Sequence, residues 1–353
     1  METVLKESMA AQQRYEIADA SQIAHARRSI GELARGLRFN ETTAGELAIV
    51  VTECGTNLLK HARHGELLVR PLVDGDGASL RYGIEVLCID NGPGIHDLHR
   101  CFEDGYTTAG SPGNGMGAIE RLSDELDIWS APERGTVLRV VFWNAPGAAN
   151  AVAAPLAYGV VNLPLATETV SGDAWSCHLN QGEFTVLVAD GLGHGPLANV
   201  AAIEAAKVLA ANGDQTLERI MDAANDALRP TRGAAVGIAR MPAFASMSGM
   251  QVSFAGIGNI SASVWTEGAH KHLVSHSGIV GHSARRAQQF DAPYPPNALV
   301  VLASDGLTSR WDLARYPGLA MRHPSLVAAI LYRDFARGRD DITVFVARTT
   351  GSA

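Results

Sequence analysis

A predicted β-hairpin in the second half of the chain constrains the fold most, because it forces two acidic residues together. Residues 173–179 and 183–189 have the composition of strands, and Asn180-Gln181-Gly182 between them is typical of a tight turn. A turn centred on the last two residues of this tripeptide sets Asp173 opposite Asp190, with Cβ atoms about 5 Å apart. Like charges so placed destabilise a hairpin, and a divalent cation is the simplest compensation. A one-residue bulge would shift this register.

Two further acidic positions flank apolar strands later in the chain. Asp305 follows the predicted strand 298–303, and Asp340-Asp341 opens the predicted strand 342–347. Each of them alone is more typical of a turn or a strand end. Four acidic positions of this kind, with oxygen ligands only and without clustered histidine or cysteine, suit magnesium or manganese rather than zinc.

The first half has the pattern of helices combined with paired strands. Apolar residues at helical spacing predict two long helices, and strand-like runs, a glycine-rich loop and a short helix follow them. The predicted helices span 21–37, 42–62 and 118–122, the strands 67–72, 80–90, 125–130 and 136–143, and the loop 105–117. This order predicts an α+β sandwich, in which helices cover one face of a sheet.

An interrupted, alanine-rich segment separates the two halves. At ordinary domain sizes, 353 residues suffice for two domains. We expect an N-terminal domain at 1–144, a linker at 145–154 and a C-terminal domain at 155–353. Proline, glycine and asparagine interrupt the segment too often for a membrane span, which needs about 20 apolar residues.

Composition excludes several classes of function. The net charge of -8, without a dense basic run, disfavours a nucleic-acid partner. Hydrophobic residues make up 46% of the chain, which excludes disorder over most of it. The cysteines Cys54, Cys88, Cys101 and Cys177 lack CxxC spacing, which favours reduced thiols in a cytoplasmic protein. The N-terminus has no apolar signal-peptide core, so we expect no membrane targeting.

Three local motifs stand out in the first half. Glu53, Asn57 and Lys60 are spaced i, i+4 and i+7 in a predicted helix and share one face, as a solvated polar face also does. The segment DNGPG, from Asp90 to Gly94, closes an apolar strand, as many turns do. The segment GNGMG, residues 113–117, lets the backbone approach a ligand closely, and the helix after it offers N-terminal amides to an anion.

In this order the motifs resemble the nucleotide-binding fold of histidine kinases, gyrase-type ATPases and anti-sigma-factor kinases, the GHKL type. The resemblance covers about residues 15–143, through VTECGTNLLKHA, IDNGPGI, GNGMGAIERL and RGTVLRV. The compact form is most similar to the RsbT-like serine kinases of the sigma-B stress pathway, which phosphorylate STAS-domain proteins. No phospho-accepting histidine module is expected before this domain, and we interpret His25 as a surface or packing residue.

This resemblance implies ATP and Mg²⁺ as cofactors and assigns roles to the motif residues. Asn57 holds the magnesium that bridges the ATP phosphates, and Asp90 accepts the adenine amino proton beside Thr136. Glu53 orients or deprotonates the attacking hydroxyl or water, and Lys60 neighbours the phosphates. The glycines that approach the base are Gly92 and Gly94, and those that wrap the phosphates are Gly113, Gly115 and Gly117.

The second half resembles the metal-dependent type 2C serine/threonine phosphatases, in their SpoIIE-like and RsbX-like bacterial branch. The segments that carry the resemblance are SGDAW, ADGLGHG, ASDGLTSRW and GRDDITVFVA, from about residue 155 to 348. It implies a β-sandwich flanked by helices, with two Mn²⁺ or Mg²⁺ ions between the sheets. The implied ligands are Asp190, which bridges both metals, the Gly191 carbonyl, Asp305 and Asp340, while Asp173 holds a metal-bound water. Asp341 could take the place of Asp340.

One position departs from the pattern of many phosphatases outside the bacterial branch. Those members carry a general-acid histidine two residues after the bridging aspartate, where this chain has Leu192. His194 lies two residues further on, and we interpret it as a loop residue. The implied mechanism is in-line attack on phosphorus by a metal-bridged hydroxide, without a phospho-enzyme.

Together the two resemblances predict a bifunctional cytoplasmic regulator of a partner-switching pathway, both kinase and phosphatase. The expected substrate is a STAS-domain phosphoprotein, an anti-sigma-factor antagonist or a stressosome-type protein. One alternative keeps only the phosphatase active, with an ATP-sensing first half. Another makes the first half a binding module that sequesters a sigma factor or activates a downstream phosphatase. Glu53 beside Asn57 favours catalysis, because a sensor needs no base.

Overall fold

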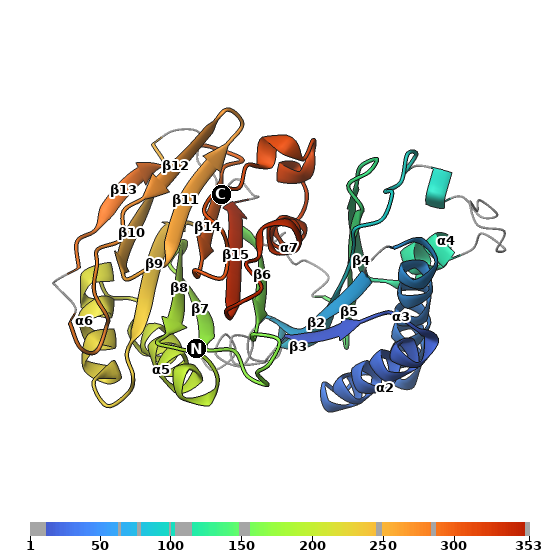
Figure 1. Ribbon diagram of the computed structural model, residues 1–353, viewed down its shortest axis with the longest axis horizontal. Helices are drawn as coiled ribbons and strands as arrows, with labels where there is room; N and C mark the ends of the chain where they lie inside the picture. Colours follow the sequence, from blue (N-terminus) through green and yellow to red (C-terminus); the bar gives the residue numbers. More distant parts are fainter. Residues whose placement is uncertain are drawn as a thin grey trace. The chain divides into compact units, whose positions relative to one another are not determined.

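The computed structural model describes residues 12–62, 65–75, 79–98, 100–102, 115–147, 156–244, 249–283 and 287–349. They form two compact units, an N-terminal one up to residue 147 and a C-terminal one from residue 156 (Figure 1). None of the helices in these ranges is both long and apolar enough to cross a membrane.

The N-terminal unit is one antiparallel sheet with helices on one face (Figure 1). In spatial order its strands are β1 (Gln13–Glu16), β2 (Gly65–Asp74), β3 (Arg81–Asp90), β5 (Thr136–Trp143) and β4 (Glu125–Ser130). The helices are α2 (Ala20–Gly36), α3 (Glu41–His61) and α4 (Gly115–Leu122), with a 3-10 turn, η2 (Arg100–Phe102). Residues of α2, α3 and α4 share one hydrophobic core with alternate residues of the strands, so the α+β prediction is confirmed.

The two long helices begin where side chains cap them. Asp19 accepts hydrogen bonds from the amides of Ser21 and Gln22, and the Asn40 side chain accepts one from the Thr43 amide, 2.9 Å. In α3 the residues that face the sheet are apolar and buried, namely Leu47, Val50, Val51, Cys54 and Leu58. This amphipathic spacing leaves the opposite face of α3 for polar side chains.

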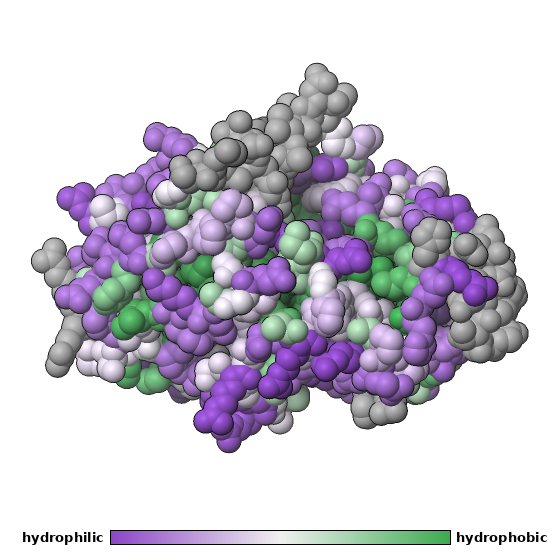
Figure 2. Space-filling model, turned by 90° about the horizontal axis from the view of Figure 1, so that it is seen from above, coloured by the Kyte–Doolittle hydropathy of each residue, from purple (hydrophilic) through white to green (hydrophobic). Residues whose placement is uncertain are grey.

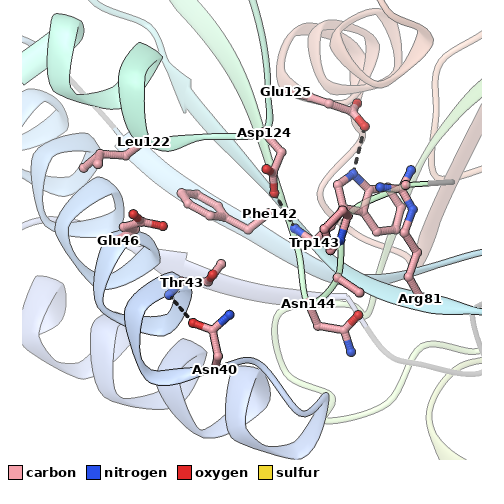
Figure 3. A pocket seen from close by; sticks show the side chains of 13 residues that line it. Asn40, Thr43, Glu46, Arg81, Leu122, Asp124, Glu125, Phe142, Trp143 and Asn144 are labelled. Carbon is pink, nitrogen blue, oxygen red and sulfur yellow. Dashed lines mark hydrogen bonds between the residues drawn. The ribbon is translucent and has the colours of Figure 1, made fainter. Parts of the chain in front are cut away.

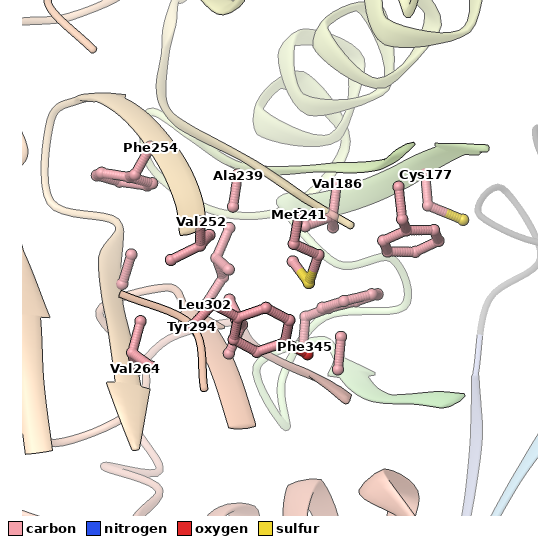
Figure 4. Close-up of a cluster of buried hydrophobic side chains, with 14 of the residues drawn as sticks. Cys177, Val186, Ala239, Met241, Val252, Phe254, Val264, Tyr294, Leu302 and Phe345 are labelled. Atoms are coloured by element: carbon pink, nitrogen blue, oxygen red, sulfur yellow. The ribbon is translucent and has the colours of Figure 1, made fainter. Parts of the chain in front are cut away.

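The C-terminal unit is a sandwich of two antiparallel sheets. The first has the order β13 (Phe290–Pro293), β10 (Gln251–Ile257), β9 (Ala234–Pro242), β8 (Glu183–Gly191) and β7 (Asp173–Asn180). The second has β12 (Ala269–Leu273), β11 (Ser261–Thr266), β14 (Leu299–Ala303), β15 (Ile342–Thr349) and β6 (Leu156–Leu163). Side chains from both sheets interdigitate in a buried core that includes Val186, Phe254, Leu302 and Phe345 (Figure 4).

Helices cover both outer faces of this sandwich. The helices α5 (Pro196–Asn212) and α6 (Leu217–Leu228) pack on the β7–β10 sheet, and α7 (Pro324–Phe335) packs on β6 and β15. Short 3-10 turns, η3 (Leu313–Arg315) and η4 (Leu319–Met321), precede α7. The buried face of α5 consists largely of alanine, so its backbone lies close to the sheet. A Cβ on Gly191, at the end of β8, would lie 2.1 Å from the Ala198 carbonyl oxygen.

The register of the β7–β8 hairpin is the predicted one. Asp173 pairs with Asp190, and the turn residues Gln181 and Gly182 have φ angles of 49° and 80°. Two consecutive residues with positive φ are typical of the two-residue turns whose twist matches antiparallel strands. The like-charged pair therefore follows from the turn, and no bulge displaces it.

On the face shown in Figure 2, hydrophilic residues cover most of the described surface, and smaller hydrophobic groups lie among them. Large apolar side chains that remain exposed in the described ranges include Ile49, Leu192, Leu197, Val200 and Met321. Scattered exposure of this kind is normal for globular surfaces.

We expect Gly159→Ala to destabilise the C-terminal unit. A Cβ at this position in β6 would lie 2.1 Å from the Ser325 backbone nitrogen in α7, and backbone cannot move aside as a flexible side chain can. Overpacking of this kind costs about 1–3 kcal/mol in the free energy of unfolding. Scanning calorimetry should show a lower melting temperature, roughly 2–4 °C for each kcal/mol lost.

Gly45→Ala in α3 is the matched control. Nothing lies within 4 Å of its Cβ position, so the alanine should stabilise the helix by about 0.5–1 kcal/mol. An unchanged melting temperature for Gly159→Ala would contradict the close packing of β6 against α7.

Candidate functional sites

Five aspartates of the C-terminal unit meet where strands of the two sheets end or begin. Asp173 and Asp190 face each other in the first sheet. Asp305 follows β14, and Asp340 and Asp341 precede β15, which pairs with β14 in the second sheet. The predicted acidic positions are thus brought to one region, although they come from four segments far apart in the sequence.

Glycines allow the segments that carry these aspartates to approach closely. A Cβ on Gly172 would lie 2.6 Å from Asp341 Oδ2, so the residue before β7 lies against the residue before β15. A Cβ on Gly306 would lie 2.1 Å from the Asp341 carbonyl oxygen. No larger residue fits at either position without moving the acidic residue beside it.

Burial and mutual repulsion raise the pKa values of three carboxyl groups in the cluster, those of Asp173, Asp190 and Asp341. Burial raises the pKa of Asp190 to about 9, with further contributions from the charges of Asp173 and Asp305. Burial likewise raises the pKa of Asp173 to about 7, with the charge of Asp341 adding to it, although the Ser304 and Thr343 hydroxyls hydrogen-bond this carboxylate. Burial also raises the pKa of Asp341. A positive charge among them would relieve the repulsion that these shifts reflect.

Two carboxylate oxygens in the cluster have no hydrogen-bond partner among the described residues. They are Asp173 Oδ2 and Asp341 Oδ2, both buried. The other Asp341 oxygen accepts a hydrogen bond from the Leu165 amide, 2.8 Å, so the side chain is held with one oxygen unsatisfied. Buried polar atoms without partners are rare, and these two fit a cation or its bound water.

The donor chemistry suits a hard divalent metal, although the side chains are not already in ligating positions. Among the described residues, no three acidic, histidine or cysteine side chains converge on a single point at metal–ligand distance. Oxygen-only donors of high charge density fit Mg²⁺ or Mn²⁺. Binding would therefore draw the carboxylates together around the ion.

The structure adds partners that sequence reasoning did not assign. Asn259 Nδ2 donates to Asp305 Oδ2, 2.7 Å, and so orients that carboxylate from the loop between β10 and β11. His194 Nδ1 lies 2.6 Å from Glu168 Oε1 and its ring is more than half exposed, which agrees with its interpretation as a loop residue. Asn259 lies 46 residues from Asp305, and no local pattern signals that contact.

In the N-terminal unit, the polar face of α3 meets the beginning of α4. A Cβ on Gly115 would lie 2.7 Å from Glu53 Oε2 and 4.0 Å from Asn57 Oδ1. Asn57 Nδ2 lies 3.8 Å from Met116 Sδ. The structure therefore joins Glu53 and Asn57 to the glycine-rich segment, while Lys60 lies exposed in the last turn of α3. Gly117 is buried within α4, and Gly113 lies outside the described residues.

Asp90 ends β3 in a tight turn. Its Oδ1 accepts a hydrogen bond from the Gly92 amide, 2.6 Å. The β3–β5 pairing ends with Ile89 opposite Val137, the residues next to Asp90 and Thr136 in the sequence. Gly94 has φ of 73°, and a Cβ there would lie 2.0 Å from the Ala131 carbonyl oxygen. Only glycine fits there, so the turn beside Asp90 has a fixed shape.

A hollow of about 480 Å³ lies elsewhere in the same unit (Figure 3). It is lined by the first turns of α3, including Asn40 and Glu46, and by Asp124 and Trp143. The Arg81 guanidinium stacks over the Trp143 ring at 4.1 Å. None of the predicted site residues lines it, because Glu53, Asn57 and Lys60 lie toward the other end of α3.

Comparison with known proteins relates each unit to a family. Residues 17–142 match the histidine kinase-like ATPase domain, and residues 180–350 match stage II sporulation protein E (SpoIIE). The serine/threonine-protein kinase RsbT of Bacillus subtilis is 28% identical over 119 residues, which are 33% of this chain and 86% of that protein. The phosphoserine phosphatase RsbX of the same organism is 23% identical over 141 residues, 40% of this chain and 69% of that protein.

A solved structure supports the fold of the second unit. A chain from a study of the bacterial stressosome, described there as a modular system adapted to control secondary messenger signalling, is 26% identical with a TM-score of 0.50. The match covers 55% of this chain and 99% of that one. The chain therefore carries a histidine kinase-like ATPase domain followed by a SpoIIE domain.

Proposed function

We propose that the chain is a cytoplasmic, bifunctional partner-switching regulator. Its C-terminal domain, residues 155–353, would remove phosphate from serine or threonine of a STAS-domain protein, and its N-terminal domain, residues 1–144, would add it from ATP. The observation that carries the proposal is the buried cluster around Asp190, with two unsatisfied carboxylate oxygens. Similarity to a phosphoserine phosphatase and to a serine/threonine kinase supports the two opposed reactions.

The residues of the acidic cluster have two different roles in the proposed phosphatase reaction. Asp190, the Gly191 carbonyl, Asp305 and Asp340 would hold two Mn²⁺ or Mg²⁺ ions. When bound, these ions supply an activated water and neutralise the phosphoryl oxygens. Asp173 would orient the attacking water through the oxygen that has no hydrogen-bond partner among the described residues.

Asp341 differs from its neighbour in the sequence. One of its oxygens accepts a hydrogen bond from the Leu165 amide, and the other is buried with no partner in the described part of the chain. Asp340 instead accepts a hydrogen bond from the Asp341 amide, 3.0 Å. We therefore infer that both aspartates serve the cluster, with Asp340 nearer to solvent.

In the N-terminal domain, some of the candidate site residues would bind the nucleotide and one would take part in catalysis. Asp90 would accept the adenine amino proton beside Thr136, and Asn57 would hold the magnesium ion on the phosphates. Glu53 reaches the first residue of α4, where amides of a helix N-terminus favour phosphate. A carboxylate so close to that anion site has little use in a pure sensor, so we favour kinase activity over ATP sensing or sequestration of a sigma factor.

The first prediction concerns the metal. In EDTA near neutral pH, Asp190→Asn should raise the melting temperature of the C-terminal unit, because the buried Asp190 carboxyl group must take up a proton on folding and the amide need not. Mn²⁺ should stabilise the wild type strongly and the variant weakly, since binding to the folded state alone raises stability. Scanning calorimetry measures both effects, and hydrolysis of a phosphoserine peptide should fall by at least about 100-fold.

Asp222→Asn, on the exposed side of α6, is the control, and both its melting temperature and its Mn²⁺ response should match those of the wild type. Full turnover in excess EDTA would reject the metal assignment.

The second prediction concerns the nucleotide. Asp90→Asn should abolish ATP binding to the full chain, because the adenine amino group loses its charged acceptor and the amide places a donor on the same side chain. Asn57→Ala should weaken binding only in the presence of Mg²⁺. His25→Ala is the control, since His25 packs edge-on against Tyr15 at 5.8 Å between ring centroids. Isothermal titration that finds unchanged affinity for Asp90→Asn would remove Asp90 from the site.

The third prediction concerns the opposition of the two activities. With a STAS-domain protein and ATP, the wild type should consume ATP while leaving little phosphoprotein. Asp190→Asn should let phosphoprotein accumulate, and adding Glu53→Ala should return it to the background level; mass spectrometry measures both. If Asp190→Asn still binds ATP but phosphorylates no STAS-domain protein, the N-terminal domain is a sensor or a sequestering module.

A further inference from the structure

A second loop lies against the loop that follows Asp190. The Leu192 amide donates a hydrogen bond to the Gly233 carbonyl, 3.0 Å. Gly233 directly precedes β9, and the first residue of β9, Ala234, pairs with Gly191 at the end of β8. Backbone pairing therefore places the α6–β9 loop beside the acidic cluster.

This second loop carries an arginine at the rim of the cluster. Arg232 Nη1 lies 3.2 Å from the point that a Cβ on Gly193 would occupy. Gly193 is the third residue after Asp190, so their Cα atoms lie at most about 10 Å apart. The Gly193 carbonyl oxygen is 3.3 Å from the Cβ position of Gly172, and that position is 2.6 Å from Asp341 Oδ2. The backbone of Gly193 and Gly172 thus lies between the Arg232 guanidinium and the Asp341 carboxylate.

Arg232 is free to bind a ligand. Within the described ranges it forms no hydrogen bond and no ion pair, and its side chain is exposed. Neighbouring arginines are occupied, since Arg229 pairs with Asp226 at 3.0 Å and Arg240 donates to the Gly213 carbonyl at 2.7 Å. All five N–H donors of the Arg232 guanidinium therefore remain available.

The backbone on both sides of Arg232 is held in place. The Thr231 hydroxyl donates to the Leu228 carbonyl, 2.7 Å, and accepts from the Gly233 amide, 3.0 Å. Gly233 has φ of 80°, and a Cβ there would lie 2.7 Å from the Val280 carbonyl oxygen. A fixed loop lowers the conformational entropy lost when the side chain binds a ligand.

We propose that Arg232 binds the phosphoryl group of the substrate at the rim of the metal centre. The inference rests on the proposed phosphatase function and names a residue that recognises its substrate. A guanidinium matches two phosphoryl oxygens with two parallel N–H donors, and it adds positive charge next to the group under attack. Because Arg232 is exposed, it suits a phosphoryl group carried on the surface of a protein.

The test compares Arg232→Ala and Arg232→Lys with the wild type, all as full chains loaded with Mn²⁺. For a phosphoserine peptide, Arg232→Ala should raise KM roughly ten- to hundredfold, the loss expected for a hydrogen bond to a charged group. Inorganic phosphate should raise the melting temperature of the wild type but not that of Arg232→Ala. Arg232→Lys should recover part of the phosphate effect, since it keeps the charge but not the paired donors.

Arg229→Ala is the matched control, being an exposed arginine of the same loop region that already has a partner. It should keep the KM and the phosphate response of the wild type. The proposal fails if Arg232→Ala keeps them too. It also fails if Arg232→Ala loses the stabilisation by Mn²⁺, because Arg232 would then support the metal loop. If the wild type hydrolyses no peptide but its phosphate response still depends on Arg232, the phosphate site stands and the proposed phosphatase activity fails.

Discussion

Repulsion among buried carboxylates determines how the C-terminal unit responds to a bound cation. The β7–β8 register fixes Asp173 opposite Asp190, and Gly172 and Gly306 bring Asp341 against them. Without a cation, folding must leave charged groups in a poorly solvated place or protonate them, which the raised pKa values of Asp173 and Asp190 express. Such a cluster lowers the free energy of unfolding of the sandwich when no ligand is bound. Binding sites commonly reduce stability in this way.

The surrounding packing explains how the unit tolerates this repulsion. Two sheets share a large apolar core, and the alanine face of α5 lets the end of β8 lie directly on the helix backbone. The strands are buried along most of their length, so the carboxylates at their ends cannot separate without breaking ladder hydrogen bonds. Rigid strands with variable loops at their ends are a general way to position catalytic groups.

Local patterns in the sequence predicted the features that depend on neighbouring residues. The turn at Gln181 and Gly182 was enough to pair Asp173 with Asp190, and the period of α3 was enough to place Glu53 and Asn57 on one face. Helix α4 begins at Gly115, three residues before the predicted start, because glycine weakens the helical signal without preventing a helix. Contacts between distant segments, such as Asn259 with Asp305 and Gly172 with Asp341, depend on how the sheets stack, and no local period encodes them.

The two units hold their candidate sites by the same physical means. In each, an aspartate lies at the end of a buried strand, Asp90 as the last residue of β3 and Asp190 as the next-to-last residue of β8, and a nearby glycine has no room for a side chain. A carboxylate at the end of an apolar strand is costly unless a partner compensates it. The Gly92 amide already donates to Asp90, 2.6 Å, and in each unit we expect a bound ligand to add to the compensation. Ligand binding should therefore stabilise each unit separately, ATP the first and Mn²⁺ the second, by mass action on its folded state. If both proposed reactions act on one substrate bound to this chain, the linker sets the effective concentration of the substrate at each site. The phosphorylation level of the substrate would then report the ratio of the rates at which phosphate is added and removed.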